Sequence, residues 1–277
     1  MRDFRQLLEG RWQQSCLCVG LDSNYEKIPS HLKSLPVKGT IFNFNREIVD
    51  ATQDLVCAYK LQIAFYEAKG PEGIAAMMET VEYAQERYPD IPVIVDAKRA
   101  DIGNTNDAYT IATFNVYRFD AMTLHPYLGI GALQPFLNRK EKGCIILCRT
   151  SNPEAREFQD LTVQRNGTEM PLWKYVAHQV TEVWNTNGNC CMVAGATYPE
   201  ELAEIRAIAG DMPLLIPGIG AQGGDIEATV KAGKDSRGTG MIINNSRDII
   251  FASSGPGFAE VARQKTIKFR DEINRYR

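Results

Sequence analysis

The sequence predicts an α/β fold, one (β/α)8 TIM barrel that forms a single domain over residues 1–277. Eight apolar runs alternate with eight helical segments along the chain. The runs are continuously apolar, which is typical of parallel strands covered on both faces. No linker or low-complexity tract divides the chain. An open, doubly wound sheet is the competing fold.

The first half of the chain predicts four strand–helix units after a short N-terminal helix. The opening segment MRDFRQLLEGRWQQ is charged and amphipathic, which indicates that helix. Apolar runs such as CLCVGL predict the strands. We expect strands at 16–21, 56–62, 92–98 and 121–126. Helices are expected after them at 42–53, 71–88, 104–116 and 129–139.

The second half predicts four more units and one insertion. Strands are expected at 143–150, 190–196, 213–220 and 240–246, with helices at 172–184, 199–209, 224–233 and 257–275. The polar stretch 151–171, after the fifth strand, exceeds the usual length of a loop. It predicts either a functional loop or a small hairpin insertion, and Asn166-Gly167-Thr168 within it indicates a turn.

Composition excludes several classes of function. The formal net charge is −3 and no basic stripe is present, so we expect no nucleic-acid partner. No run approaches 18 apolar residues, so we expect no membrane span. The charged N-terminal segment lacks the apolar core of a signal peptide, and a cytoplasmic location is expected.

Cysteine and histidine usage argues against disulfides and a zinc site. Seven cysteines without a CxxC motif indicate small buried hydrophobic side chains in a reducing compartment. The three histidines are far apart in sequence and have no ligand spacing.

A functional site of a (β/α)8 barrel lies at the carboxyl ends of its strands. Seven of the eight expected strands carry polar residues or glycines near their carboxyl ends. In the second strand this residue is Lys60, which lies within the strand itself. The full set is Asp22, Lys60, Asp96, Lys98, His125, Arg149, Thr150, Ser151, Gly218, Gly220, Gln222, Asn244, Asn245 and Arg247.

The run VDAKRADIGNT places alternating charges where the third strand ends. Asp96 and Lys98 are two residues apart, so they share one face of a strand, whereas Arg99 need not. Lys60 lies in the neighbouring apolar strand, and burying its ammonium costs several kcal/mol unless it is paired. A network with Asp101 results if that carboxylate also reaches the same mouth. A purely structural ion-pair cluster is the alternative, and the buried lysine favours chemistry.

The run DAKRADIGNT resembles the D-x-K-x-x-D-I signature of the orotidine 5′-phosphate decarboxylase family. Asp22, Lys60, Ser151, the segment PGIGAQGGD at 217–225 and Arg247 stand where that family has its other motifs. The insertion and the glycine-rich segment resemble its longer-chain bacterial branch. The resemblance implies decarboxylation of orotidine 5′-phosphate to UMP and CO2, the last step of de novo pyrimidine nucleotide synthesis. It implies no metal and no cofactor.

The resemblance also implies a role for each matching residue. Lys98 corresponds to the general acid that protonates C6, and Asp96 to the carboxylate set against the substrate carboxylate. Lys60 and Asp101 complete the charge array, and Asp101 and Ile102 enter from the partner subunit of a homodimer. The remaining substrate contacts are Asp22 and Thr105 for the ribose, Ser151 for the pyrimidine, Gln222 and Arg247 for the phosphate, and Pro217 and Gly223 beside them.

The chemistry is compatible with these roles. Loss of CO2 from C6 leaves a carbanion without an adjacent electron sink, so fixed cations must stabilise the developing charge. A lysine between two aspartates keeps its proton, because nearby anions favour the charged form.

Three other functions stay open. A metal-dependent sugar-phosphate decarboxylase or hexulose-phosphate synthase of the same barrel type shares D-x-K-x-x-D, but differs at the strand that carries Lys60. An inactive barrel that binds a nucleotide is the second. The third is a dinucleotide-dependent oxidoreductase, because Gly218-x-Gly220-x-x-Gly223 matches GxGxxG. No acidic residue closes a strand about 20 residues later, so a loop that binds one phosphate is favoured.

Overall fold

Eight parallel strands close into a barrel in the computed structural model, which describes residues 2–220 and 223–277. The strand order is β1-β10-β9-β8-β5-β4-β3-β2, and β1 pairs with both β2 and β10. Closure confirms the predicted barrel and excludes the open sheet. The strands are β1 (Leu17–Gly20), β2 (Ala58–Gln62), β3 (Val93–Arg99), β4 (Ala121–Leu124), β5 (Gly143–Arg149), β8 (Cys190–Ala194), β9 (Leu214–Pro217) and β10 (Met241–Asn245).

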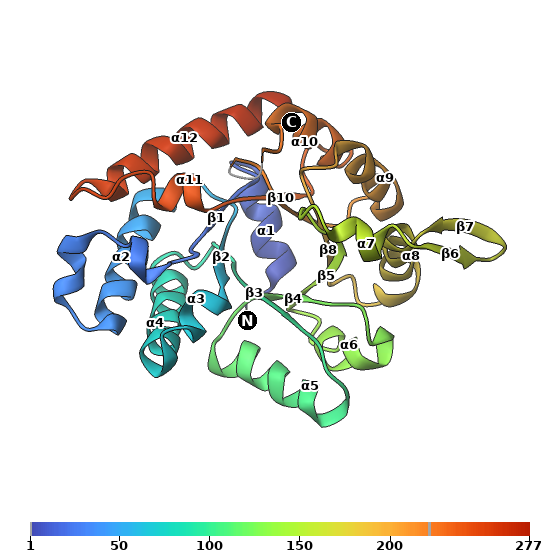
Figure 1. Cartoon of the computed structure of the whole chain (residues 1–277), viewed down its shortest axis with the longest axis horizontal. Helices are drawn as coiled ribbons and strands as arrows, with labels where there is room; N and C mark the ends of the chain where they lie inside the picture. The colour runs from blue at the N-terminus through green and yellow to red at the C-terminus, as the bar shows by residue number, and fades with distance from the viewer. Residues whose placement is uncertain (1, 221–222) are drawn as a thin grey trace.

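Helices surround the barrel on its outside (Figure 1). They are α2 (Val37–Thr52), α4 (Gly70–Arg87), α5 (Gly103–Thr110), α6 (Gly129–Leu137), α8 (Leu172–His178), α9 (Pro199–Ala209), α10 (Ile226–Gly233) and α12 (Phe258–Tyr276). A π-helical segment extends each of two helices: residues 111–116 follow α5 and residues 179–184 follow α8. Most of these helices turn an apolar stripe toward the strands. In α2, for example, Ile41, Phe44 and Ile48 are fully buried. Helix α5 is different, because its buried residues are the polar Asn106 and Thr110.

Several short elements were not predicted. Two 3₁₀ turns (Tyr25–Lys27 and Ser30–Ser34), α3 (Ile63–Glu67) and α11 (Arg247–Ile250) are each five residues or fewer. Segments of that length are too short to show a helical period. Six of the eight predicted strands also ran one to three residues too long at their carboxyl ends, where the backbone leaves the sheet to form the loops of the mouth.

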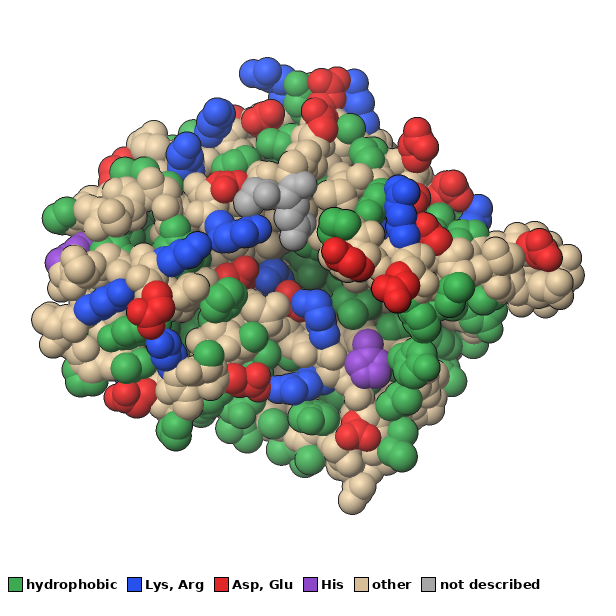
Figure 2. Space-filling model, viewed as in Figure 1, with side chains coloured by type: hydrophobic (Ala, Val, Ile, Leu, Met, Phe, Trp, Pro, Cys, Tyr) green, Lys and Arg blue, Asp and Glu red, His purple; other side chains and the backbone are tan. Residues whose placement is uncertain are grey.

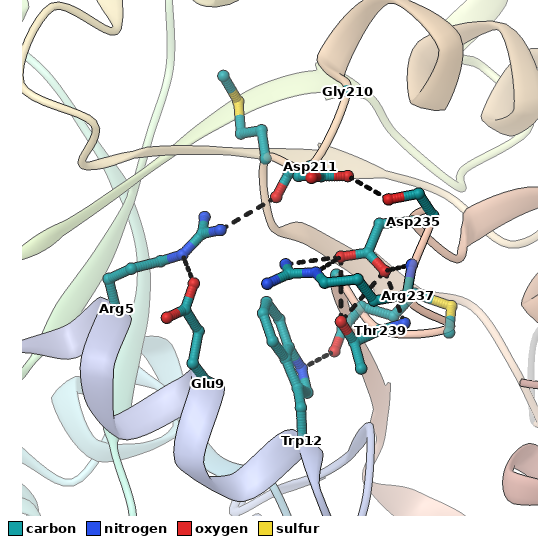
Figure 3. A network of polar contacts seen from close by, with 12 residues as sticks. Arg5, Glu9, Trp12, Gly210, Asp211, Asp235, Arg237 and Thr239 are labelled. Carbon is teal, nitrogen blue, oxygen red and sulfur yellow. Dashed lines mark hydrogen bonds and ion pairs between the residues drawn. The ribbon is translucent and has the colours of Figure 1, made fainter.

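Helix α1 (Phe4–Trp12) closes the amino-terminal end of the barrel. Phe4, Leu8 and Trp12 are buried, and the Trp12 indole N–H donates to the carbonyl of Met241 at 2.6 Å. Arg5 pairs with Glu9 at 2.7 Å and donates to the Asp211 carbonyl (Figure 3). The predicted N-terminal helix is confirmed, and it leaves the opposite end of the barrel open.

The stretch after β5 forms α7 (Ala155–Gln159) and an antiparallel hairpin of β6 (Thr162–Arg165) and β7 (Thr168–Pro171). The hairpin projects from the rim of the molecule at the right of Figure 1. Its turn is Asn166-Gly167, with φ of 50° and 79°, a pair of positive values that Asn-Gly tolerates well. Of the two forms predicted for this stretch, the structure shows the hairpin insertion, and it confirms the predicted turn.

The core accounts for the cysteines. All seven are buried and free, and burial raises the pKa of Cys16 to about 11, so these thiols stay protonated. No helix in the described part of the chain combines the length and apolar character that crossing a membrane requires.

Candidate active site

A cavity of about 470 Å³ opens at the carboxyl ends of the strands. Figure 2 shows a hollow near the middle of this face, with basic and acidic side chains gathered in and around it. Polar residues from six strands or the loops that follow them line it. They are Asp22, Lys60, Gln62, Asp96, Lys98, Thr123, Thr150, Ser151, Asn152, Asn244, Asn245, Ser246 and Arg247. The site therefore lies where the barrel predicts it.

Four charged side chains alternate in sign along one wall of the cavity. Lys60 Nζ lies 3.5 Å from Asp22 Oδ1 and 3.5 Å from Asp96 Oδ2. Lys98 Nζ lies 2.6 Å from Asp96 Oδ1. The array within one chain is thus Asp22–Lys60–Asp96–Lys98. Lys60 is 3% exposed, whereas the Lys98 side chain is 47% exposed at the open end of the array. Of the two lysines, Lys98 is therefore the one that is free to meet a ligand directly.

The array fixes the charge state of its buried members. Burial alone would lower the pKa of Lys60, but the carboxylates of Asp22 and Asp96 outweigh it and raise that pKa above its ordinary value. Burial alone would raise the pKa of Asp96, but Lys60 and Lys98 outweigh it and lower the pKa to about 2. At neutral pH the site therefore holds a fixed carboxylate next to fixed cations.

Asp96 accepts from two neutral donors as well. The Gln62 amide donates to Oδ2 at 3.1 Å, and the Thr123 hydroxyl donates to Oδ1 at 2.8 Å. With Lys60 on one oxygen and Lys98 on the other, both carboxylate oxygens have two partners each. This saturation fixes the orientation of the carboxylate, because each oxygen has about two lone-pair directions to satisfy.

An irregular β3 brings Lys98 beside Asp96, which corrects the expectation of a regular strand. The register between β3 and β4 shifts between Val95 and Arg99, as in a β-bulge. Lys98 has a φ of 49°, in the left-handed region. Arg99 turns away and pairs with Glu67 at 2.5 Å, as the sequence allowed.

The rest of the cavity offers an apolar floor and a polar rim. Leu147, Val193 and Leu215 line the floor from β5, β8 and β9, and Ile219 lines the cavity from the segment after β9. Of the predicted substrate contacts, Asp22, Ser151, Pro217 and Arg247 line the cavity. Asp22 also accepts from the Ser246 hydroxyl at 2.7 Å. A flat, partly apolar ring with polar groups at its edge would fit such a space.

Other predicted residues lie outside the cavity of this chain. Asp101, Ile102 and Thr105 are not among its lining residues, and Ile102 is 64% exposed. The Asp101 carboxylate accepts from the backbone N–H of Ile102 at 2.7 Å. The buried Asn106 side chain holds this loop, because it accepts from the Asp101 N–H at 2.8 Å and donates to the Asp101 carbonyl. Their predicted entry into a partner's site stays a prediction.

The glycine-rich segment is described only in part. Gln222 lies outside the described residues. Gly223 is exposed and does not line the cavity, and its N–H donates to the Gly220 carbonyl at 2.7 Å. Gly218 and Ile219 of the same segment do line it.

Two polar residues at strand ends have other surroundings. Arg149 is 1% exposed and pairs with Glu201 at 2.5 Å and Asp160 at 2.9 Å, so it ties β5 to α9 and the insertion. His125 lines a separate, mostly apolar cavity next to Phe158. Neither lines the charged cavity.

Sequence reasoning missed several lining residues. Gln62 could have been predicted from the sequence, because it follows Lys60 by two residues and therefore shares its strand face. Thr123 could not have been predicted, because its place beside Asp96 depends on the register between β3 and β4. Asn152 and Ser246 lie in loops, for which the sequence has no periodic signal.

The closed barrel and the charged cavity at its carboxyl mouth define a (β/α)8-barrel enzyme. The chain belongs to the orotidine 5′-phosphate decarboxylase / HUMPS family, whose profile matches residues 15–260. It is 49% identical over 276 residues to the orotidine 5′-phosphate decarboxylase of Janthinobacterium sp. (strain Marseille), covering 99% of this chain and 98% of that one.

Solved structures resemble it over the same extent. An OMP decarboxylase from Leishmania donovani has a TM-score of 0.82 and 34% identity, covering 97% of this chain and 99% of that one. A UMP synthase from the same organism has a TM-score of 0.89 and 36% identity. That match covers 100% of this chain and 57% of the longer synthase.

Proposed function

We propose that this enzyme decarboxylates orotidine 5′-phosphate to UMP and CO2. The observation that carries the proposal is the charged array Asp22–Lys60–Asp96–Lys98. Its exposed member, Lys98, points a cation into a cavity that has an apolar floor. The family match and the names of the relatives support the same reaction. They favour it over a metal-dependent sugar-phosphate decarboxylase or hexulose-phosphate synthase, the alternative from the sequence.

The array supplies what the reaction requires. The bond between C6 and the carboxylate carbon breaks, CO2 leaves, and the electron pair stays on C6. Lys98 stabilises that developing charge as a cation held in place, then donates a proton from Nζ to C6. The lysine recovers its proton from solvent. Asp96, ionised with a pKa of about 2, faces the substrate carboxylate and disfavours it before CO2 leaves.

Lys60 and Asp22 act behind the reacting atoms. Lys60 offsets the charge of Asp96, and Asp22 is proposed to contact the ribose. Ser151 is proposed to contact the pyrimidine edge, and Arg247 the phosphate, with Gln222, Pro217 and Gly223 beside it. A guanidinium fork suits a phosphate dianion because it donates two parallel hydrogen bonds.

The site is proposed to be completed by a second copy of the chain, in a cytoplasmic homodimer. Asp101 and Ile102 lie on a loop held by Asn106, and Thr105 lies in α5 directly after it; none of the three lines the cavity of its own chain. Exposed apolar side chains flank the two helices that follow: Ile102 and Ile111 lie at the two ends of α5, and Tyr127 and Leu128 directly precede α6. An exposed apolar patch of this kind is typical of an interface.

The test is the loss of orotidine 5′-phosphate absorbance with purified protein in the presence of a chelator. We expect turnover to persist with the chelator, and UMP to be the product. Lys98→Ala should lower turnover by at least about 1,000-fold, because it removes the cation and the proton donor together. Turnover that requires added Mg²⁺, or a Lys98→Ala variant close to wild type, would contradict the proposal.

A further inference from the structure

The hydroxyl of Thr123 is at the centre of the bulge that carries the catalytic lysine. Thr123, on β4, is 1% exposed and lines the cavity. Its Oγ1 accepts from the backbone N–H of Ala97 at 3.0 Å and from that of Lys98 at 2.9 Å. It donates its own proton to Asp96 Oδ1 at 2.8 Å. One donor and two acceptor directions are all in use, so the hydroxyl is fully satisfied.

These contacts replace the sheet hydrogen bonds that the bulge removes. In a regular parallel sheet, alternate backbone N–H groups of β3 would donate to carbonyls of β4, and those between them would point toward β2. Here the register shifts between Val95 and Arg99, and two successive N–H groups converge on one side-chain oxygen instead. Lys98 has a φ of 49°, a conformation that a residue with a side chain adopts only when its surroundings hold it there.

The same hydroxyl also fixes the carboxylate that Lys98 contacts. Among the described residues, Asp96 Oδ1 accepts hydrogen bonds only from Thr123 and Lys98. Asp96 Oδ2 accepts hydrogen bonds from Gln62 and Lys60. Without the hydroxyl, Oδ1 would have the half-exposed lysine as its remaining partner. The carboxylate and the Lys98 backbone would then lose a shared anchor.

We propose that Thr123 is a positioning residue for the decarboxylation, because its hydroxyl sets the Asp96 carboxylate and the Lys98 backbone relative to each other. The inference rests on the proposed function. Thr123 does not donate to the reacting atoms. The Thr123 hydroxyl affects the rate by placing the Lys98 cation, whose position matters most in the transition state. A small misplacement of a catalytic group lowers the rate by about 100-fold.

The experiment compares variants that differ only in the hydroxyl. Thr123→Val keeps the shape and removes the oxygen, and Thr123→Ser keeps the oxygen and removes a methyl group. We expect Thr123→Val to lower kcat for orotidine 5′-phosphate by about 100-fold with KM within about threefold, since the phosphate and ribose contacts lie elsewhere. We expect Thr123→Ser to keep kcat within about threefold of wild type. If Thr123→Val does not fold, the Ser and Ala variants form the same comparison, because both lack the methyl group.

Thr266→Val is the matched control. Thr266 is fully buried in α12, and its hydroxyl donates to the carbonyl of Ala262 at 2.7 Å. Its loss should change stability but not kcat. Equal damage from Thr123→Ser and Thr123→Val, or a Thr123→Val enzyme with wild-type kcat, would overturn the inference. An inactive wild-type protein would instead overturn the proposed function itself.

Discussion

Lys60 and Asp96 show how two charges persist inside an apolar barrel. Each loses hydration on burial, and the loss exceeds what a single ion pair returns unless further hydrogen bonds are made. Lys60 has carboxylates on two sides, and Asp96 has four donors. Replacing either residue removes a charged partner from the other in the core. Stability and charge state at this site are therefore coupled.

Asp96 predicts a specific dependence of stability on pH. Its folded pKa is about 2, below the ordinary value of 3.8. A lowered folded pKa contributes stability above pH 4, and this stability is lost as the pH falls from about 4 to about 2. The full contribution is about 2 kcal/mol. Urea unfolding of wild type and Asp96→Asn from pH 6 to pH 2 should show a difference in unfolding free energy that shrinks by about that amount.

Other carboxylates titrate in the same window, so only the difference between the two proteins is informative. Asp211→Asn, at the opposite end of the barrel, is a suitable control. A constant difference between wild type and Asp96→Asn at every pH would show that Asp96 has an unshifted pKa.

Arg247, at the exposed rim of the cavity, predicts a phosphate-dependent effect on rate. Remote binding energy is used to hold a charged site in its reactive arrangement. Arg247→Ala should lower kcat/KM for orotidine 5′-phosphate by about 2–4 kcal/mol of transition-state stabilisation. The slow reaction of orotidine without its phosphate should barely change. An equal loss for both substrates would mean that Arg247 supports the fold or the chemistry in general.

At the scale of elements, loops attached to rigid strands position the rim of the site. The loop after β5 carries Thr150, Ser151 and Asn152 into the cavity. Gln159, at the end of α7, holds it from outside: its Oε1 accepts from the Thr150 N–H at 3.0 Å and its Nε2 donates to the Thr150 hydroxyl at 2.8 Å. The insertion therefore has a structural link to the proposed pyrimidine contact.

Gln159→Leu tests that link. The change removes both hydrogen bonds and leaves the loop without its outer anchor, so substrate binding should weaken. We expect KM for orotidine 5′-phosphate to rise by about tenfold, the loss of roughly 1.4 kcal/mol, with a smaller change in kcat. The assay is steady-state kinetics.

Gln164→Leu is the control for this change. Gln164 is exposed on β6, in the projecting hairpin of the same insertion. Its substitution should leave both constants unaltered. If both glutamine variants raise KM alike, the hairpin rather than the Gln159 anchor affects binding.

At the scale of the whole molecule, one chain forms a cavity that its own Asp101 does not reach. Three members of the D-x-K-x-x-D run that the sequence places together are separated by the fold: Asp96 and Lys98 face the cavity, and Asp101 lies on the held loop. In the proposed homodimer, Asp101 of the second copy would bring a negative charge next to the exposed Lys98. The alternating array would then extend to a fifth charge.

Mixed dimers test this arrangement. Subunits with Lys98→Ala and with Asp101→Asn should each be nearly inactive alone. In a heterodimer one site carries both lesions and the other carries neither. Random 1:1 mixing should therefore restore about a quarter of the wild-type activity, since half of the dimers have one intact site of two.

Mixing Lys98→Ala with Asp96→Asn is the control. Both residues belong to the same chain's cavity, so every heterodimer site retains one lesion and no activity should return. Heterodimers must be shown to form in both mixtures. Absence of recovery in the first mixture would place Asp101 in its own subunit's site.

The sequence by itself predicted the eight strand–helix units of a barrel and the identity of most charged site residues, and barrel closure in the structure excluded the open sheet. Apolar runs and helical segments depend on local composition and period, which a single chain displays directly. Lys60 in an apolar strand and the charges of the 96–101 run are enough to indicate a site, because charges in such places are costly unless they are paired. The hairpin insertion was also accessible, because Asn166-Gly167 is a turn with a known backbone requirement.

Only the tertiary structure decided how these residues meet. The bulge in β3, the placement of Thr123 under Lys98 and the pairing of Asp22 with Lys60 depend on the register between strands and on barrel closure. These are contacts between residues far apart in sequence, and local patterns do not encode them. Arg149 and His125 show the converse, since both end strands at the mouth and yet face other neighbours. Side-chain direction at a strand end is set by the loop that follows, and that conformation is fixed by the whole fold.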